Sequence, residues 1–225
     1  MRPVKIVVSR YNEDLSWMKE APFNQFRYIV YNKGINNHFE KCNVDEIVNL
    51  PNVGKCDHTY LYHIVKNYNN LNDINVFFPG CLNIEYKKAE AKQILYGIIK
   101  YRTAIFYGNT AANIKRHFGN FTLDNWSSVD PANKDLNPIS NTYRAKIRPY
   151  GNWFHYMFGN IKVDLYCLHG ILSIHKKDIV KHKIERYLEL LNAVSVDTNP
   201  EVGHYIERSW AAIFYPLVYT KIMRY

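Results

Sequence analysis

The hydrophobic residues in the first half of the chain form short apolar runs, which alternate with longer segments at helical spacing. Apolar runs rich in β-branched residues predict strands at 4–9, 26–34, 44–50 and 74–80. Segment 58–71 has Leu61, Ile64, Val65 and Tyr68 at i, i+3, i+4 and i+7, which predicts an amphipathic helix, with Asp57 as its N-cap. A second long helix is predicted at 85–102. Strands that alternate with helices indicate an α/β domain with a mainly parallel sheet flanked by helices.

The periodicity breaks between residues 119 and 160, where turn-forming residues are frequent. A long irregular stretch inside a domain is typical of a binding loop or lid. Beyond it, 163–179 returns to a strand–turn–strand or strand–helix pattern, and helices are predicted at 182–194 and 199–219.

Composition narrows the class of protein. Hydrophobic residues make up 47% and aromatic residues 15% of the 225 residues, enough for the core of a single domain. No stretch reaches the ~20 apolar residues of a membrane span, and the N-terminus does not resemble a signal peptide. These features predict a cytoplasmic protein, or a fragment of a longer one. The four cysteines are scattered and suggest neither a zinc site nor a disulfide framework.

The chain is basic, with a formal net charge of +9. Such a charge suits nucleic acid, an anionic surface or a phosphorylated ligand. The lysines and arginines are spread along the sequence without a run of five, so nucleic-acid binding is not favoured.

The last predicted helix directs a carboxylate toward the core. Glu207 shares a face with Trp210, Ala211 and Phe214 at i, i+3, i+4 and i+7. Either this glutamate has a chemical role or it pairs with an internal arginine such as Arg144 or Arg148 and fixes the helix.

Five stretches together resemble a known family: VVSRYNEDLSW, YNKG, NVGKCDHTYLYHIVKNY, VFFPG and NPEVGHYIERSWAAIF. The family was first catalogued as a domain of unknown function and occurs in fungi, algae and large DNA viruses. Within it, the chain is similar to glycosyltransferases of chlorella viruses, which have the GT-A fold and use nucleotide sugars. The resemblance spans residues 4 to 216. It implies a nucleotide-binding half at 1–110, an acceptor half at 111–225, a UDP-sugar donor and a glycan or glycoprotein acceptor, such as a growing glycan on a viral capsid protein.

The resemblance implies that the nucleotide lies at the carboxyl ends of the first strands. The residues implied for donor binding are Ser9, Arg10, Tyr11, Asn12, Glu13, Asn32, Lys33, Asn52, Gly54, Lys55, Asp57, His58, Pro79, Gly80, Gly170, His204 and Arg208. A helix N-terminus suits a pyrophosphate, and Lys55 and His58 would add positive charge there. The alternative is that Arg10 and Lys55 are ordinary solvated cations and that Tyr11 packs on the core.

One feature of the family pattern is missing. GT-A enzymes usually carry a DxD motif after the fourth strand, which binds Mn²⁺ or Mg²⁺ through carboxylates. Here PGCLNIEY follows that strand, and its nearest carboxylate is Glu85. Either other residues hold the metal, or lysine and arginine replace it, or the metal dependence is weak.

Direct displacement at a sugar needs a base for the acceptor hydroxyl, and the candidates are Glu207 and Glu201. Partial desolvation raises the pKa of a carboxylate toward values useful for a base. Alternatively, Glu201 is a first-turn acid that favours the helix dipole. Asp124 and Asp130 are the next candidates for the base.

The segment 141–159 is basic and aromatic. Its rings, Trp153, Tyr150 and Tyr156, are candidates to stack on an acceptor sugar, or they belong to the core. Arg144, Lys146 and Arg148 are candidates to face phosphates. The leading interpretation is therefore a glycosyltransferase, followed by a nucleotide-sugar or carbohydrate-binding module without turnover, and then by a basic nucleic-acid-binding protein.

Overall fold

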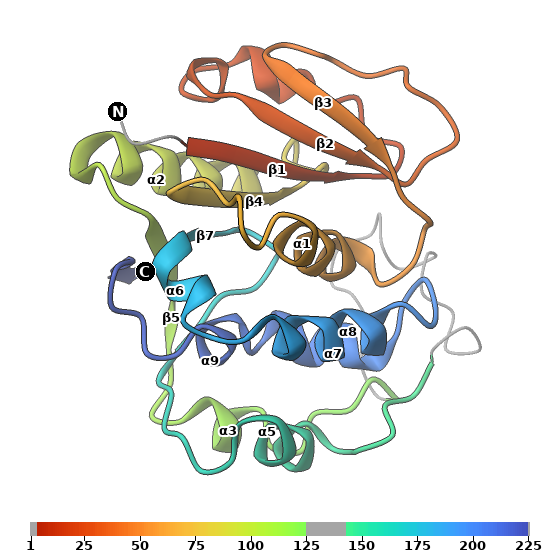
Figure 1. Cartoon of the computed structure of the whole chain (residues 1–225), viewed down its shortest axis with the longest axis vertical. Coiled ribbons are helices and arrows are strands. Elements are labelled where there is room, and N and C mark those ends of the chain that lie inside the picture. The colour runs from red at the N-terminus through yellow and green to blue at the C-terminus, as the bar shows by residue number, and fades with distance from the viewer. Residues whose placement is uncertain (1–3, 125–142, 225) are drawn as a thin grey trace.

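The computed structural model describes residues 4–124 and 143–224, and its largest element is a five-stranded sheet in the order β3-β2-β1-β4-β7 (Figure 1). The strands are β1 (Val4–Arg10), β2 (Tyr28–Asn32), β3 (Val44–Asn49), β4 (Ile74–Pro79) and β7 (Leu172–His175). The first four run parallel, and β7 pairs antiparallel with β4. The predicted mixed, mainly parallel sheet of a Rossmann-like α/β fold is thus confirmed, including all four of the N-terminal strands.

Successive side chains of the central strands belong alternately to two hydrophobic clusters, one on each face of the sheet. Val7 and Phe77 belong to one cluster, while Val8 and Phe78 belong to the other. Successive side chains of a strand point to opposite faces, so β1 and β4 are buried on both sides. The helix α2 (Glu85–Tyr101) packs on the second cluster, and α1 (Lys55–Lys66) with α7 (Ile184–Val194) packs on the first.

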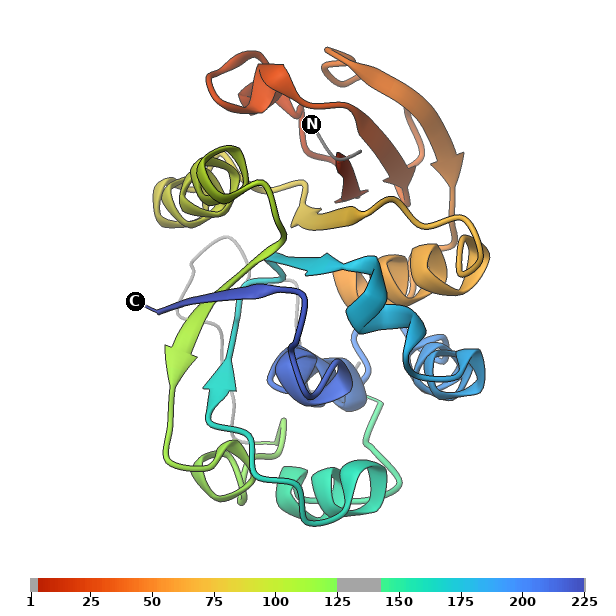
Figure 2. The same ribbon diagram turned by 60° about the vertical axis from the view of Figure 1, so that its left-hand side comes forward.

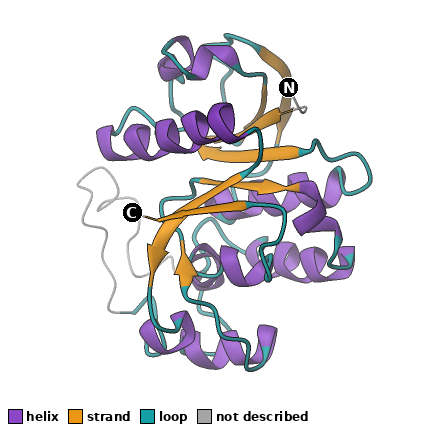
Figure 3. Cartoon of the chain, turned by 90° about the vertical axis from the view of Figure 1, so that its left-hand side faces the viewer, coloured by secondary structure: helices purple, strands orange, loops and turns teal. Residues whose placement is uncertain are grey.

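A smaller three-stranded sheet, in the order β6-β5-β8, lies below the first sheet (Figure 2). It contains β5 (Ile105–Thr110), β6 (Leu165–Tyr166) and β8 (Lys221–Arg224). Helices gather around it and at its far end (Figure 3). They are α3 (Ile114–His117), α5 (Tyr150–Phe158), α6 (Lys176–Val180), α8 (Glu201–Glu207) and α9 (Trp210–Ile213), and two 3₁₀ turns, η1 (Ser16–Lys19) and η2 (Phe23–Gln25), follow β1. No helix in the described ranges is long and apolar enough to cross a membrane.

Three predictions about local structure were wrong. The helix expected from residue 58 begins at Lys55, and its N-cap is Gly54 rather than Asp57. The single helix expected at 199–219 is two short helices, because the chain turns at Ser209, whose buried hydroxyl bonds the Tyr150 hydroxyl at 2.9 Å. The irregular stretch at 119–160 contains α5. The predicted lid falls largely on 125–142, which lies outside the described residues.

Candidate functional site

The carboxyl ends of β1, β2 and β4 meet the start of α1 on the right of Figure 1. Open α/β sheets bind ligands just outside the carboxyl ends of their strands, and this region of the protein is called the crevice after that position. Ser9, the penultimate residue of β1, connects this strand to α1, because its hydroxyl lies 2.9 Å from that of Thr59. Its carbonyl also accepts the Gly80 N–H, which follows Pro79 at the end of β4. The predicted residues of β1, β4 and α1 therefore do come together.

The turn after β1 is held by a carboxylate. Oε2 of Glu13 accepts the backbone N–H groups of Tyr11 at 2.7 Å and Asn12 at 3.1 Å. Trp17 anchors the same turn to the end of β4 by donating from Nε1 to the Gly80 carbonyl at 2.9 Å. Glu13 thus supports the turn from within, while Tyr11, 45% exposed, lies at its open edge.

Arg10 was predicted to face the donor, but the structure shows a buried structural guanidinium. It is 1% exposed and donates to the Glu13 carbonyl, the Asn32 side chain, and both the carbonyl and the side chain of Asn36. Asn32 is also fully used, since its amide group donates to Asn36 and Asn37. These two residues fix the loop that follows β2, because both donors of Asn32 and four of the five donors of Arg10 bind protein acceptors.

Lys33 ties the end of β2 to the start of α1. Its ammonium group donates to the Val53 carbonyl at 2.5 Å and to the Lys55 carbonyl, and burial lowers its pKa to about 8. Gly54 is required at the helix start because its φ is +57° and a Cβ there would lie 2.4 Å from the Val194 carbonyl oxygen. Lys55 follows at the surface, and Asn52 is exposed just before. Of the predicted residues Lys33, Asn52, Gly54 and Lys55, the two exposed ones are Asn52 and Lys55.

Asp57 and His58 lie inside the first turn of α1, not at its surface. Oδ1 of Asp57 accepts from Nε1 of Trp210 at 3.1 Å, and burial together with the charge of Glu207 raises the Asp57 pKa well above its usual range. Burial also lowers the pKa of His58 to about 4. His58 is therefore uncharged at neutral pH, and the positive charge predicted for it is wrong.

Glu207, at the end of α8, is the carboxylate that reaches the crevice. Its side chain is 24% exposed, and Oε1 accepts the backbone N–H of His169 at 2.8 Å. Burial lowers the pKa of the nearby Lys55, and the negative charge of Glu207 opposes that shift. Glu207 thus lies among Lys55, Asp57 and Arg208, whose Nη1 is 3.7 Å from its Oε2.

His169 is a site residue that the sequence analysis missed. Its Nδ1 lies 3.1 Å from Oε2 of Glu90, whose side chain is 4% exposed. Its φ of +67° is unusual for a residue with a Cβ, and strain of this kind clusters at functional sites. The ring itself is 39% exposed beside Tyr86. His169 therefore contacts two carboxylates: its ring contacts Glu90, and its backbone N–H donates to Glu207.

Gly170 was predicted to bind the donor, but the structure places its backbone close to protein atoms. Its φ is +68°, and a Cβ would lie 2.7 Å from Sγ of Cys56 in α1. Its carbonyl accepts the Tyr60 hydroxyl at 2.7 Å. The turn 169–170 is thereby locked against α1, which places His169 beside Glu207.

His204 and Arg208 are more internal than predicted. Nε2 of His204 lies 2.9 Å from Oδ1 of Asn199, and burial lowers its pKa to about 3, so it carries no charge at neutral pH. The Arg208 guanidinium is 7% exposed, donates to the His204 carbonyl and stacks 3.8 Å over the ring of Phe121. His204 is not suited to bind phosphate, and Arg208 joins α8 to the segment after α3.

Glu201 is a structural carboxylate, which contradicts its prediction as a base. It is fully buried and accepts the backbone N–H groups of Leu123 at 2.7 Å and Ala145 at 2.8 Å. Nε of Arg148 lies 2.7 Å from its Oε2. The internal arginine pair that was considered for Glu207 is made by Glu201 instead. Asp124 also contacts Arg148, at 2.5 Å, and Asp130 lies outside the described residues.

The aromatic residues predicted to stack on an acceptor belong mostly to the core. Tyr150 is fully buried, and Trp153 is 5% exposed against the ring of Tyr205. Both lie on the inner face of α5, where large aromatic surfaces stabilise the packing of α5 on α8. Tyr156, 64% exposed on the same helix, remains open.

A divalent cation at this site stays a prediction. Within 4–124 and 143–224, no three His, Cys, Asp or Glu side chains are grouped to hold a metal. Near the crevice, Glu13 accepts backbone N–H groups and Asp57 accepts from Trp210, whereas Glu207 is partly exposed.

The chain matches the model of a known protein family. Residues 6–221 match the family described as Protein of unknown function (DUF3431), and the chain therefore belongs to that family. No curated protein matches the chain.

Proposed function

We propose that this member of the DUF3431 family is a glycosyltransferase that moves a sugar from a UDP-sugar to a hydroxyl of a glycan. The observation that carries the proposal is the placement of Glu207. This partly exposed carboxylate is held by the His169 N–H at the carboxyl ends of the parallel strands, beside Lys55 and the start of α1. A proton acceptor and a cation at one crevice are what direct displacement at a sugar requires.

In this proposal, the residues of the site have separate roles. Tyr11 and Asn12, at the open edge of the turn after β1, contact the nucleoside. Lys55 and the first N–H groups of α1 face the diphosphate, because the N-terminus of a helix favours an anion. Within the fold, the sheet order with an antiparallel strand after β4 is compatible with the GT-A arrangement.

The reaction is a single displacement. The oxygen of the acceptor hydroxyl forms a bond to the anomeric carbon, and the bond from that carbon to the diphosphate oxygen breaks. The electron pair leaves with UDP, whose charge Lys55 stabilises, and the hydroxyl proton passes to the Glu207 carboxylate. His169 holds that carboxylate in place through its backbone, and Glu90 orients the imidazole ring of His169. We further propose that the protein works in the cytoplasm, where nucleotide sugars are available to it.

Two measurements test the function. The melting temperature is recorded with UDP, GDP and TDP, with and without Mn²⁺, because a ligand that binds the native state raises it. Release of UDP is then measured with a panel of UDP-sugars. A raised melting temperature with no UDP release from any sugar would indicate a binding module. No response to any nucleotide would overturn the proposal.

A further inference from the structure

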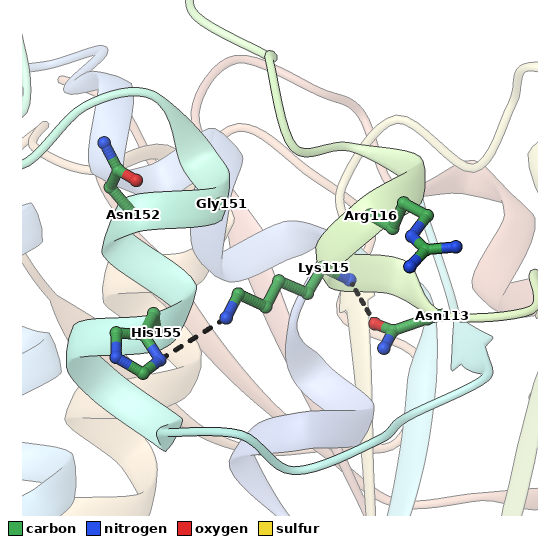
Figure 4. A pocket seen from close by; sticks show the side chains of 6 residues that line it. All are labelled: Asn113, Lys115, Arg116, Gly151, Asn152 and His155. Atoms are coloured by element: carbon green, nitrogen blue, oxygen red, sulfur yellow. Dashed lines mark hydrogen bonds between the residues drawn. The ribbon is translucent and has the colours of Figure 1, made fainter.

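A polar hollow lies between α3 and α5 (Figure 4). These two helices are at the opposite end of the molecule from the five-stranded sheet (Figure 1). Its cavity volume is about 480 Å³, within the range of small-molecule sites. The residues that line it are Asn113, Lys115, Arg116, Gly151, Asn152 and His155. None of them belongs to the crevice around Glu207, so the hollow does not depend on the function proposed above.

Backbone hydrogen bonds build the hollow. The Gly151 N–H donates to the Gly119 carbonyl at 2.9 Å, and the Tyr150 N–H donates to the Phe121 carbonyl at 3.0 Å. These bonds hold the start of α5 against the chain that leaves α3. Because Tyr150 is also fixed in the core, the two walls of the hollow are set by the fold and not by flexible side chains.

Among the described residues, no acid forms an ion pair with Lys115 or Arg116 in the hollow. The Lys115 ammonium group contacts only neutral atoms among the described residues, Nδ1 of His155 at 3.3 Å and Oδ1 of Asn160 at 3.5 Å. Arg116 is exposed and makes no ion pair with any described residue. In residues 111–124 and 143–160 the acidic residue is Asp124, and it already pairs with Arg144 and Arg148.

Lysine and arginine side chains can only donate hydrogen bonds, so Lys115 and Arg116 provide donors to the hollow. Nδ1 of His155 lies 3.3 Å both from the Lys115 ammonium group and from the Gly159 carbonyl oxygen. Oδ1 of Asn113 accepts the backbone N–H of Lys115 at 3.0 Å, which leaves the side-chain NH₂ group of Asn113 available (Figure 4). The ammonium group of Lys115, the guanidinium of Arg116 and the amide of Asn113 thus line one space with donors.

We propose that this hollow binds a phosphate group carried by a sugar. Lys115 and Arg116 supply charge-assisted hydrogen bonds to the phosphate oxygens. The volume exceeds what a lone phosphate needs, and the amides of Asn113 and Asn152 suit the hydroxyls of an attached sugar. The ligand class is a sugar phosphate, bound apart from the crevice at the strand ends.

Calorimetric titration with inorganic phosphate, glucose 1-phosphate and glucose, at constant ionic strength, tests the proposal. Lys115→Gln and Arg116→Gln are each expected to weaken binding of glucose 1-phosphate about tenfold or more. Lys66→Gln, which removes an exposed lysine of α1, serves as the matched charge control and is expected to leave binding unchanged. Tighter binding of glucose 1-phosphate than of inorganic phosphate separates the sugar phosphate from the free anion.

Three results would overturn the proposal. They are no binding of either phosphate compound, equal affinities for wild type and both hollow variants, and an equal loss in Lys66→Gln, which would show an effect of net charge. Because the titration contains no UDP-sugar, its outcome is independent of whether the protein transfers sugars.

Discussion

The guanidinium of Arg148 lies against the buried carboxylate of Glu201, with Nε 2.7 Å from Oε2. The same carboxylate accepts backbone N–H groups from Leu123 and Ala145, on either side of residues 125–142. One glutamate therefore joins α8 to two distant parts of the chain. The two glutamates of α8 therefore have different roles. The Glu201 carboxylate is buried against protein donors, whereas the Glu207 side chain is partly exposed.

Glu201→Gln is expected to destabilise the protein by ~1–3 kcal/mol, because one of the two buried backbone N–H groups that the carboxylate accepts would lose its acceptor. The amide would also turn an NH₂ group toward an N–H donor. Denaturant unfolding measures the loss, and Glu46→Gln, an exposed change on β3, is the control. A free energy of unfolding equal to that of wild type would contradict the structural role.

Glu207→Gln is expected to lower turnover by ~10²–10⁴-fold, because the amide cannot accept the hydroxyl proton. The amide oxygen can still accept the His169 N–H, so the melting temperature and UDP affinity should stay close to wild type. Turnover is measured as UDP release from the best sugar donor. Normal turnover in this variant would show that another group takes the proton.

The strands were predictable because their signal is local. Runs such as Val4–Ser9 are apolar and β-branched, and burial on both faces of a sheet requires such runs. The helix α5 was not predictable in this way, since Pro149, Gly151 and several aromatic residues disfavour a helix locally. Its packing against α8 through Tyr150 and Trp153 overrides that preference.

The site was only partly predictable, for a related reason. Helical spacing correctly marked Glu207 as unusual, but it did not show that Glu201 meets Arg148, because that contact joins residues far apart in the chain. The sequence indicated that Arg10 binds the ligand, because it does not show that Glu13, Asn32 and Asn36 accept its hydrogen bonds. For His169, the available signal was its position just before the turn glycine Gly170.

Lys55→Ala is expected to weaken UDP binding by ~1–3 kcal/mol, the usual value of a charge-assisted hydrogen bond. Arg10→Ala is expected instead to lower the melting temperature, since it empties a buried position with four protein acceptors. Titration calorimetry with UDP and thermal unfolding distinguish the two variants. Unchanged UDP affinity in Lys55→Ala would show that the diphosphate lies elsewhere.

The protein is expected to lose stability in mild acid because several histidines are buried in the uncharged form. Burial lowers the pKa of His63 to about 4 and that of His204 to about 3, whereas an unfolded histidine titrates near pH ~6.5. The unfolded state therefore binds more protons as the pH falls below ~6.5. Each such histidine then removes up to ~1.4 kcal/mol per pH unit until its folded pKa is reached, while stability above pH ~6.5 is unaffected.

Denaturant unfolding between pH 7 and pH 4 measures this slope. His63→Gln keeps a partner for the Tyr31 hydroxyl, which lies 2.9 Å from Nδ1 of His63, but it cannot titrate. We expect this variant to lose less stability on acidification than wild type, by ~1.4 kcal/mol per pH unit within the window. His38→Gln, an exposed change, should keep the wild-type slope. If His63→Gln also keeps the wild-type slope, burial of neutral His63 does not contribute to the acid sensitivity.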